Sequence, residues 1–176
     1  MNDDAAAIVA ISQLYPRYSD AVWRFDYDAF AELFVENAEW RISGRAYLGR
    51  AAIRNAIESI LGPNFIRVRI VFGLPIVTVG GDGTACARMY MTEHCAWKSG
   101  ERSISFGTYH DRFRLTSEGW KFAWRLFELD YRGSPDLTGT WHDNPDRGPP
   151  PELPASDENT VDHASTRWEL ARGEQA

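Results

Sequence analysis

The chain has 176 residues and a mass of 20.0 kDa, which matches one globular domain large enough to bury a core. Hydrophobic residues make up 44% and charged residues 25%, a balance that argues against a disordered chain and a membrane protein. The net charge of −6 and the lack of a basic run argue against a nucleic-acid partner. The aromatic share of 13% suits either a thick core or a pocket for a ring-bearing ligand.

The first residues, the length of the apolar runs and the cysteines bear on the cellular compartment of the protein. The start, Met1-Asn2-Asp3-Asp4, is acidic where a signal peptide is positive, and no apolar run is long enough to span a membrane. Cys86 and Cys95 fall on one expected strand, about 30 Å apart at ~3.3 Å per residue, which is too far for a disulfide. We therefore expect a cytoplasmic protein with no membrane partner.

Two helices are predicted in the first part of the chain. Apolar residues recur at steps of three and four from Ile8 to Val22, as on one face of a helix, and Pro16 should kink or split it. Asp26 is typical of the N-cap of a second helix, whose apolar side carries Tyr27, Phe30, Leu33 and Phe34.

Beyond these helices the pattern changes from helical to extended. A short strand is predicted at 40–42, ending at Gly44, and a third helix over 50–61 with Gly62-Pro63 as its stop signal. Only strand patterns separated by turn residues follow, over 66–72, 76–79, 84–97, 102–115 and 120–131. Helices followed by a meander favour an α+β fold, with the helices on one face of a curved, mostly antiparallel sheet.

The composition divides the chain in two. Residues 1–132 are predicted to form the domain, and residues 133–176 a Pro-rich and charged C-terminal arm that is irregular or wraps the domain. Within the arm, residues 156–172 form either a short helix carrying Trp168 and Leu170 or part of a disordered tail.

The turn at Ser99-Gly100 sets the expected register of the longest hairpin. A two-residue turn pairs Lys98 with Glu101 and aligns Arg88 with Asp111 as a cross-strand pair. One face is then polar, with Tyr90, Thr92, His94 and Tyr109, and the other apolar, with Met89, Met91, Cys95, Trp97, Ile104 and Phe106. Either the apolar face meets the core, or the polar face lines a pocket and the apolar face meets another subunit. The second arrangement predicts a homo-oligomer, a trimer or a dimer.

Several kinds of chemistry lack support in the sequence. The four histidines show neither HExxH nor close Cys/His spacing, so no metal site is expected. Neither a GxSxG elbow nor a Walker or GxGxxG loop occurs, so we expect no nucleophilic elbow and no cofactor. Acid–base chemistry remains, and His94 is the best candidate for it because the unperturbed pKa of a histidine is about 6.5, close to neutral pH.

Six segments carry a resemblance to a known family: Ile11–Tyr18, Asp26–Phe34, Ala38–Trp40, Gly49, Gly107–Asp111 and Gly119–Phe122. In order and spacing they resemble the SnoaL-like branch of the NTF2-like (cystatin-like cone) superfamily, over about residues 8–131. The resemblance implies three N-terminal helices on a curved sheet that encloses a hydrophobic pocket. It favours the arrangement in which the polar face of the hairpin points inward.

The resemblance also implies activities. Members include polyketide cyclases, scytalone dehydratase, hexachlorocyclohexane dehydrochlorinase, cofactor-free lyases and small subunits of ring-hydroxylating dioxygenases. The aspartate and histidine of the dehydratase-like dyad correspond here to Trp23 and Arg69, and a pocket tyrosine to Ile42, so these groups are replaced. His94 matches a second pocket histidine, and Arg125 matches a position that faces the pocket.

The resulting expectation is a cofactor-independent lyase acting on an aromatic or hydrophobic small molecule. His94, Arg69, Tyr109 and Arg125 would do the chemistry, with His94 moving the proton and the arginines stabilising an oxyanion. The substrate would contact Tyr18, Trp23, Trp40, Phe72, Tyr90 and Thr92. The alternatives are a non-catalytic ligand-binding or accessory subunit, as the lost dyad suggests, and a polyketide cyclase or isomerase.

Overall fold

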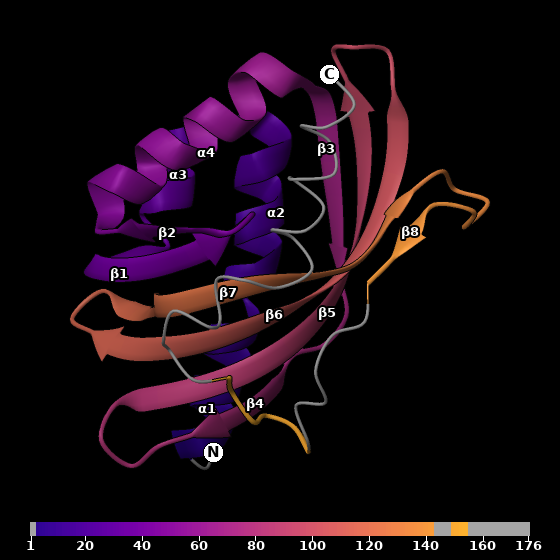
Figure 1. Ribbon diagram of the computed structural model, residues 1–176. Coiled ribbons are helices and arrows are strands. Elements are labelled where there is room, and N and C mark those ends of the chain that lie inside the picture. The colour runs from indigo at the N-terminus through magenta and orange to yellow at the C-terminus, as the bar shows by residue number, and fades with distance from the viewer. Residues whose placement is uncertain (1–2, 143–148, 155–176) are drawn as a thin grey trace.

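The computed structural model describes residues 3–142 and 149–154, and this part of the chain contains four helices and eight strands (Figure 1). The helices are α1 (Asp3–Ser12), α2 (Leu14–Arg24), α3 (Tyr27–Ala31) and α4 (Arg50–Asn64). The strands are β1 (Phe34–Ile42), β2 (Arg45–Leu48), β3 (Phe65–Phe72), β4 (Ile76–Val79), β5 (Thr84–Trp97), β6 (Arg102–Thr116), β7 (Gly119–Gly133) and β8 (Thr140–Trp141).

The strands form one curved sheet with the order β2-β1-β7-β6-β5-β3, to which β4 adds on β5 and β8 on β7. Strands β1 and β7 run parallel, and the other paired strands are antiparallel. The helices cover the concave face, and the hydrophobic core fills the space between them and the sheet (Figure 1). The predicted α+β architecture is confirmed.

The first predicted helix is split, as expected, but before Pro16. Helix α1 ends at Ser12 and α2 begins at Leu14. Pro16 therefore lies in the first turn of α2, where its missing N–H removes no helical hydrogen bond. Tyr15 and Tyr18 on α2 are almost fully buried against the sheet.

The second predicted helix is shorter than expected. Asp26 caps α3 by accepting a hydrogen bond from the Ala29 N–H at 3.0 Å, but the helix ends at Ala31. Phe34 belongs to β1 instead, because it pairs with Phe122 on β7. Strand β1 is therefore longer than the predicted 40–42, and β2, which the sequence reading missed, pairs with it.

Helix α4 continues through Gly62 and Pro63 to Asn64, beyond the predicted stop. Its last carbonyls find partners in the β5–β6 turn: the Lys98 N–H donates to the Asn64 oxygen at 2.8 Å, and the Lys98 ammonium donates to the Gly62 oxygen. These bonds stabilise a final turn that Gly and Pro alone disfavour.

The predicted register of the β5–β6 hairpin is wrong by one residue. The loop has three residues, because Trp97 donates to the Glu101 oxygen at 3.0 Å and Gly100 takes a φ of 96°. This loop length, with Gly at its third position, shifts the whole pairing and places His110 opposite Arg88. Because side chains alternate, a shift of one residue exchanges the faces of one strand relative to the other.

The corrected register also moves the expected faces. Met89, Met91 and Trp97 are buried under the helices, whereas Ile104 and Phe106 lie on the convex face. Most of the apolar face that motivated the predicted oligomer, namely its β5 residues, is therefore part of the domain core.

The arm predicted from residue 133 onward is described only in part. Strand β8 pairs with the end of β7, through Trp141 opposite Tyr131 and Thr140 opposite Arg132. The helix considered for 156–172 lies outside the described residues. Among the residues that are described, no helix is both long and apolar enough to cross a membrane.

Candidate active site

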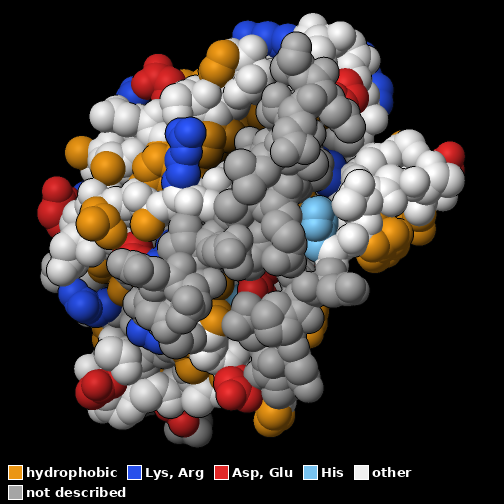
Figure 2. Space-filling model, viewed as in Figure 1, with side chains coloured by type: hydrophobic (Ala, Val, Ile, Leu, Met, Phe, Trp, Pro, Cys, Tyr) orange, Lys and Arg blue, Asp and Glu red, His pale blue; other side chains and the backbone are white. Residues whose placement is uncertain are grey.

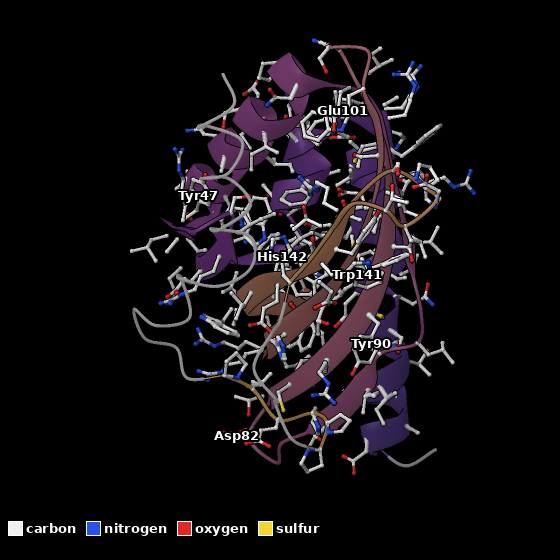
Figure 3. All side chains as sticks on the ribbon, turned by 45° about the vertical axis from the view of Figure 1, so that its right-hand side comes forward. Tyr47, Asp82, Tyr90, Glu101, Trp141 and His142 are labelled. Carbon is white, nitrogen blue, oxygen red and sulfur yellow. The ribbon has the colours of Figure 1, made fainter. Side chains whose placement is uncertain are left out.

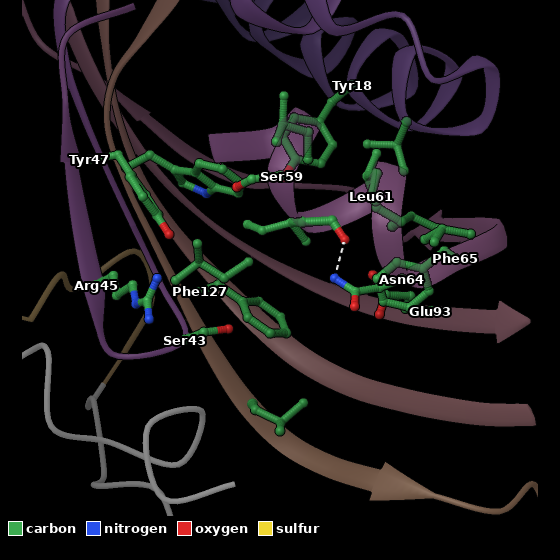
Figure 4. Close-up of a pocket in the computed structure, with 18 of the residues that line it drawn as sticks. Tyr18, Ser43, Arg45, Tyr47, Ser59, Leu61, Asn64, Phe65, Glu93 and Phe127 are labelled. Carbon is green, nitrogen blue, oxygen red and sulfur yellow. Dashed lines mark hydrogen bonds between the residues drawn. The ribbon is translucent and has the colours of Figure 1, made fainter. Parts of the chain in front are cut away.

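A cavity of about 440 Å³ lies between the concave face of the sheet, helices α2 and α4, and the β1–β2 hairpin (Figure 4). This volume is within the range of small-molecule sites, about 300–1,000 Å³. Aliphatic and aromatic side chains make up most of the wall, including Val22, Trp40, Ile57, Val68, Ile70, Phe127 and Leu129. A small number of polar groups interrupt this wall, and they determine what the cavity can do.

Two tyrosines form the inner end of the cavity. Tyr18 from α2 and Tyr109 from β6 are each 2% exposed, and their hydroxyl oxygens lie 3.3 Å apart. Burial raises the pKa of Tyr18 to about 12, an effect that Arg125 opposes, and raises the pKa of Tyr109 well above its ordinary value. Both phenols are therefore protonated at neutral pH. Only one proton is needed for the bond between them, which leaves one O–H able to donate to a ligand.

A buried arginine packs behind these tyrosines. The guanidinium carbon of Arg125 lies 3.7 Å from the ring centre of Tyr109 and 4.3 Å from that of Tyr18. Its Nε lies 3.3 Å from the Asp111 carboxylate, which also accepts a hydrogen bond from the Tyr15 hydroxyl at 2.8 Å. The cation does not line the cavity. It packs on the faces of the two tyrosine rings, and its positive charge opposes the rise that burial causes in both tyrosine pKa values.

Burial dominates the ionisation of this cluster. Desolvation raises the pKa of Asp111 to about 6, although Arg125 and the Tyr15 hydrogen bond both act to lower it. Asp111 is therefore mostly ionised at neutral pH and balances the charge of Arg125.

An acidic side chain lies on the cavity wall at β5. Among the described residues that line the cavity, Glu93 is the only Asp or Glu. Its Oε1 lies 3.5 Å from Arg132 and 3.2 Å from the Cys95 sulfur, and its side chain is 17% exposed. Its negative charge acts on both inner tyrosines, raising their pKa values further. The cavity thus combines one proton acceptor with two protonated phenols.

A family model described as a SnoaL-like domain matches residues 3–125. The chain belongs to the SnoaL-like family. No curated protein matches its sequence closely enough to count as a relative.

Solved structures share the fold of this SnoaL-like chain. A protein of Novosphingobium aromaticivorans provisionally described as an aromatic ring hydroxylase is 26% identical, with a TM-score of 0.66 over 71% of this chain and 90% of that one. A provisionally described scytalone dehydratase from the same organism is 20% identical, with a TM-score of 0.71, and the match covers 79% of this chain and 95% of that one. A hexachlorocyclohexane dehydrochlorinase is 17% identical, with a TM-score of 0.71, and the match covers 81% of this chain and 97% of that one. The NTF2-like fold implied by the sequence resemblance is confirmed.

Part of the predicted SnoaL-like site comes together. Tyr18, Trp40 and Tyr109 line the cavity. Phe72 and Arg125 pack behind the tyrosines, with the Phe72 ring centre 5.9 Å from that of Tyr109 and 5.9 Å from the Arg125 guanidinium carbon. Of the predicted aromatic wall, Trp40 thus lines the cavity and Phe72 lies behind it.

The other predicted residues do not reach the cavity. His94 is exposed on the convex face and pairs with Arg69, which is also exposed. Tyr90 is 55% exposed on the same convex face, where Thr92 also lies, and Figure 3 shows Tyr90 on the side of the sheet away from the helices. Trp23 is 45% exposed on α2, where the Arg67 guanidinium covers its ring. The placement of His94 as the pocket histidine is wrong: the one-residue register error grouped it with the inward-facing Tyr109, whereas the face of β5 that carries His94 points away from the helices.

The predicted Arg88–Asp111 pair fails for the same reason. Arg88 lies opposite His110 on the convex face, whereas Asp111 points inward to Arg125. Glu93 was missed, although the sequence held a signal for it. It alternates with Met91 and Cys95 on a strand face that is otherwise apolar, where an unpaired charge is costly and therefore informative.

Proposed function

We propose that this SnoaL-like chain is a cofactor-independent lyase that acts by acid–base catalysis on an aromatic or hydrophobic small molecule held in the cavity. The observation that carries the proposal is the Glu93 carboxylate on the wall of a mostly apolar cavity that ends in the Tyr18–Tyr109 pair. Proton movement alone drives dehydration and related eliminations, so such a site needs no metal or cofactor.

The polar groups have distinct roles in this chemistry. The Glu93 contacts with Arg132 and Cys95 both involve Oε1, so Oε2 is the oxygen that would take a proton from a substrate C–H next to a carbonyl. The C–H electrons then form an enolate, whose oxygen accepts a hydrogen bond from the free tyrosine O–H. Collapse of the enolate restores the carbonyl, forms the C=C bond and expels the leaving group from the neighbouring carbon, and the proton held by Glu93 passes to that leaving group, which restores the carboxylate.

The positive charge of Arg125 supports the role of the tyrosines as hydrogen-bond donors to the enolate oxygen. It lies against the faces of both tyrosine rings and is itself fully buried, so it is poorly screened by water. A cation there makes the tyrosine hydroxyls better donors to developing negative charge. The names of the dehydratase and dehydrochlorinase with this fold denote eliminations of the same general kind.

A second candidate function is ligand binding without catalysis, as in a carrier or accessory subunit. It is favoured by the exposed positions of Trp23 and Arg69, which replace the family dyad. Under this alternative the cavity would bind the same class of molecule but Glu93 would not transfer a proton.

Hydrogen–deuterium exchange at carbon separates these functions without knowledge of the natural substrate. The purified chain is incubated in D₂O with bicyclic aromatic ketones such as 1-tetralone and 2-tetralone, and loss of the C–H signal is followed by NMR. The lyase proposal predicts exchange above the buffer rate, reduced by roughly 10²–10⁴ in Glu93→Gln. The matched control is Glu101→Gln, an exposed residue at the hairpin tip, which should keep the full rate (Figure 3). Binding without exchange would favour the carrier function.

A further inference from the structure

The β1–β2 hairpin presents a row of side chains to the cavity. Trp40 and Ile42 on β1 alternate with outward-facing Arg41, and they pair with Tyr47 and Arg45 on β2. Because directly paired residues share a face, Trp40, Ile42, Arg45 and Tyr47 all point the same way, and all four line the cavity. Figure 4 shows Tyr47 and Arg45 on the same side of the cavity.

A tight turn fixes this row. Ser43 and Gly44 take positive φ values of 52° and 69°, and they join the paired residues Ile42 and Arg45 directly. Two successive positive φ values are typical of the two-residue turn that matches the twist of a hairpin. Arg45 therefore starts β2 in a defined position, about 7 Å along the strand from Tyr47.

Three of these four side chains carry hydrogen-bond donors, and no hydrogen bond or ion pair to other described residues engages them. The Trp40 indole is fully buried, yet its Nε1–H has no hydrogen-bond partner. Buried donors in folded proteins nearly always have a partner, so an unpaired one on a cavity wall indicates an acceptor supplied by a ligand. The cavity opens to solvent at its exposed lining residues Arg45, Ser59 and Asn64. Tyr47 and Arg45 lie beside the Trp40 indole, toward this opening.

The charges of the cavity wall are unevenly distributed. Glu93, its acidic lining residue, already has Arg132 as a partner at 3.5 Å. The acid nearest to the hairpin row in sequence, Glu39, lies on the other face of β1 and binds Arg41 and the Trp124 indole. Arg45 thus faces the cavity opening without a carboxylate of its own among the residues described. Figure 2 shows hydrophobic side chains and a basic one together on the surface between α4 and this hairpin.

We infer that Trp40, Tyr47 and Arg45 form a carboxylate subsite, so that the molecule bound is a hydrophobic or aromatic acid whose carboxylate lies at the hairpin and whose ring points toward Tyr18 and Tyr109. The inference rests on the proposed function, because it names the substrate class of the same cavity. A guanidinium with two neutral donors matches a carboxylate, which offers two acceptor oxygens and a negative charge.

Paired ligands of equal shape test the subsite. The full chain is titrated by isothermal calorimetry with 2-naphthoate and with 2-naphthamide, in low-salt buffer near neutral pH, where the first is an anion and the second is neutral. Wild type should bind the carboxylate about tenfold more tightly, a difference that added salt should reduce. Arg45→Gln should remove this preference while leaving the affinity for the amide unchanged. Arg17→Gln, the same change at an exposed α2 residue outside the cavity, should keep the preference.

The outcomes separate the subsite from the function beneath it. Equal binding of the two ligands by wild type, or an equal loss in Arg45→Gln and Arg17→Gln, would overturn the carboxylate subsite and leave the lyase proposal standing. Failure of both ligands to bind would overturn the subsite and the proposed use of the cavity together. Binding with the predicted preference, combined with no carbon exchange, would support the subsite and reject the lyase.

Discussion

At the scale of single residues, the cluster around Arg125 shows how burial and charge act together. The guanidinium is fully buried and lies close to Asp111 and to the rings of Tyr18 and Tyr109. Removing one member of such a group leaves another charge buried without a partner, which is strongly destabilising. The cluster therefore ties α2 to β6 and β7, and it fixes the tyrosines at the inner end of the cavity.

This cluster predicts a particular pH dependence of stability. The pKa of Asp111 is about 6 in the folded chain, whereas an unfolded aspartate has a pKa of about 3.9. Between these two values the folded chain holds a proton that the unfolded chain has released. The contribution of Asp111 to the free energy of unfolding is therefore highest below about pH 4 and is lost as the pH rises to about 6.

Urea unfolding of wild type and Asp111→Asn between pH 4 and pH 7 measures this contribution. We expect the stability of wild type relative to the variant to fall by roughly 1–3 kcal/mol up to about pH 6 and then to level off. A difference that stays constant over this range, or one that grows with pH, would contradict the raised pKa.

At the scale of elements, one loop decides which side chains meet the cavity. The expected two-residue turn at Ser99-Gly100 and the observed three-residue loop differ by a single position. Both loops fit the local sequence, so local turn chemistry alone does not separate them. The buried faces of the two strands do, because Met89 on β5 and Tyr109 on β6 are both buried under the helices, and the three-residue loop is the one that pairs them.

Gly107 on β6 shows that the sheet is shaped for the cavity. It lies at a register shift, and a Cβ there would come within 2.3 Å of the Phe127 ring and 2.7 Å of the Glu128 carbonyl oxygen. Phe127 lines the cavity and has little room to move. We expect Gly107→Ala to destabilise the chain by about 1–3 kcal/mol and to weaken ligand binding.

The matched control for this substitution is Gly81→Ala. A Cβ at Gly81 meets no atom within 4 Å, so the change should be close to neutral. Thermal unfolding and calorimetric titration of both variants check the prediction. Equal stability of the two would mean that β6 and Phe127 yield more easily than their contacts indicate.

At the scale of the whole molecule, the sequence predicted the fold better than the site. Helical and alternating patterns located most elements, and β4 and β5 have the predicted bounds. Strand β2 was missed because its four residues are mostly exposed and show no alternating pattern. The sequence analysis named Tyr18, Tyr109 and Trp40, which line the cavity, but it missed Glu93 although that acid stands on an otherwise apolar strand face. Arg45 depends on the pairing of β1 with β2, which one sequence does not specify.

The oligomeric state also belongs to this scale. The sequence predicted a dimer or trimer from an exposed apolar face, but much of that face is buried in the core of the domain, so the face no longer supports the prediction. It stays a prediction, and sedimentation velocity at micromolar concentration is the measurement for it. A single species at the mass of one chain would contradict it.

The central claim is that chemistry takes place on the concave side of the sheet, with Glu93 as the base. Its neighbour His94 points to the opposite face, so the two residues form a natural pair for comparison. Carbon exchange in D₂O, measured for Glu93→Gln and His94→Ala under identical conditions, tests the claim most directly. We predict a loss of roughly 10²–10⁴ in Glu93→Gln and the wild-type rate in His94→Ala. Loss of exchange in His94→Ala with full exchange in Glu93→Gln would contradict it.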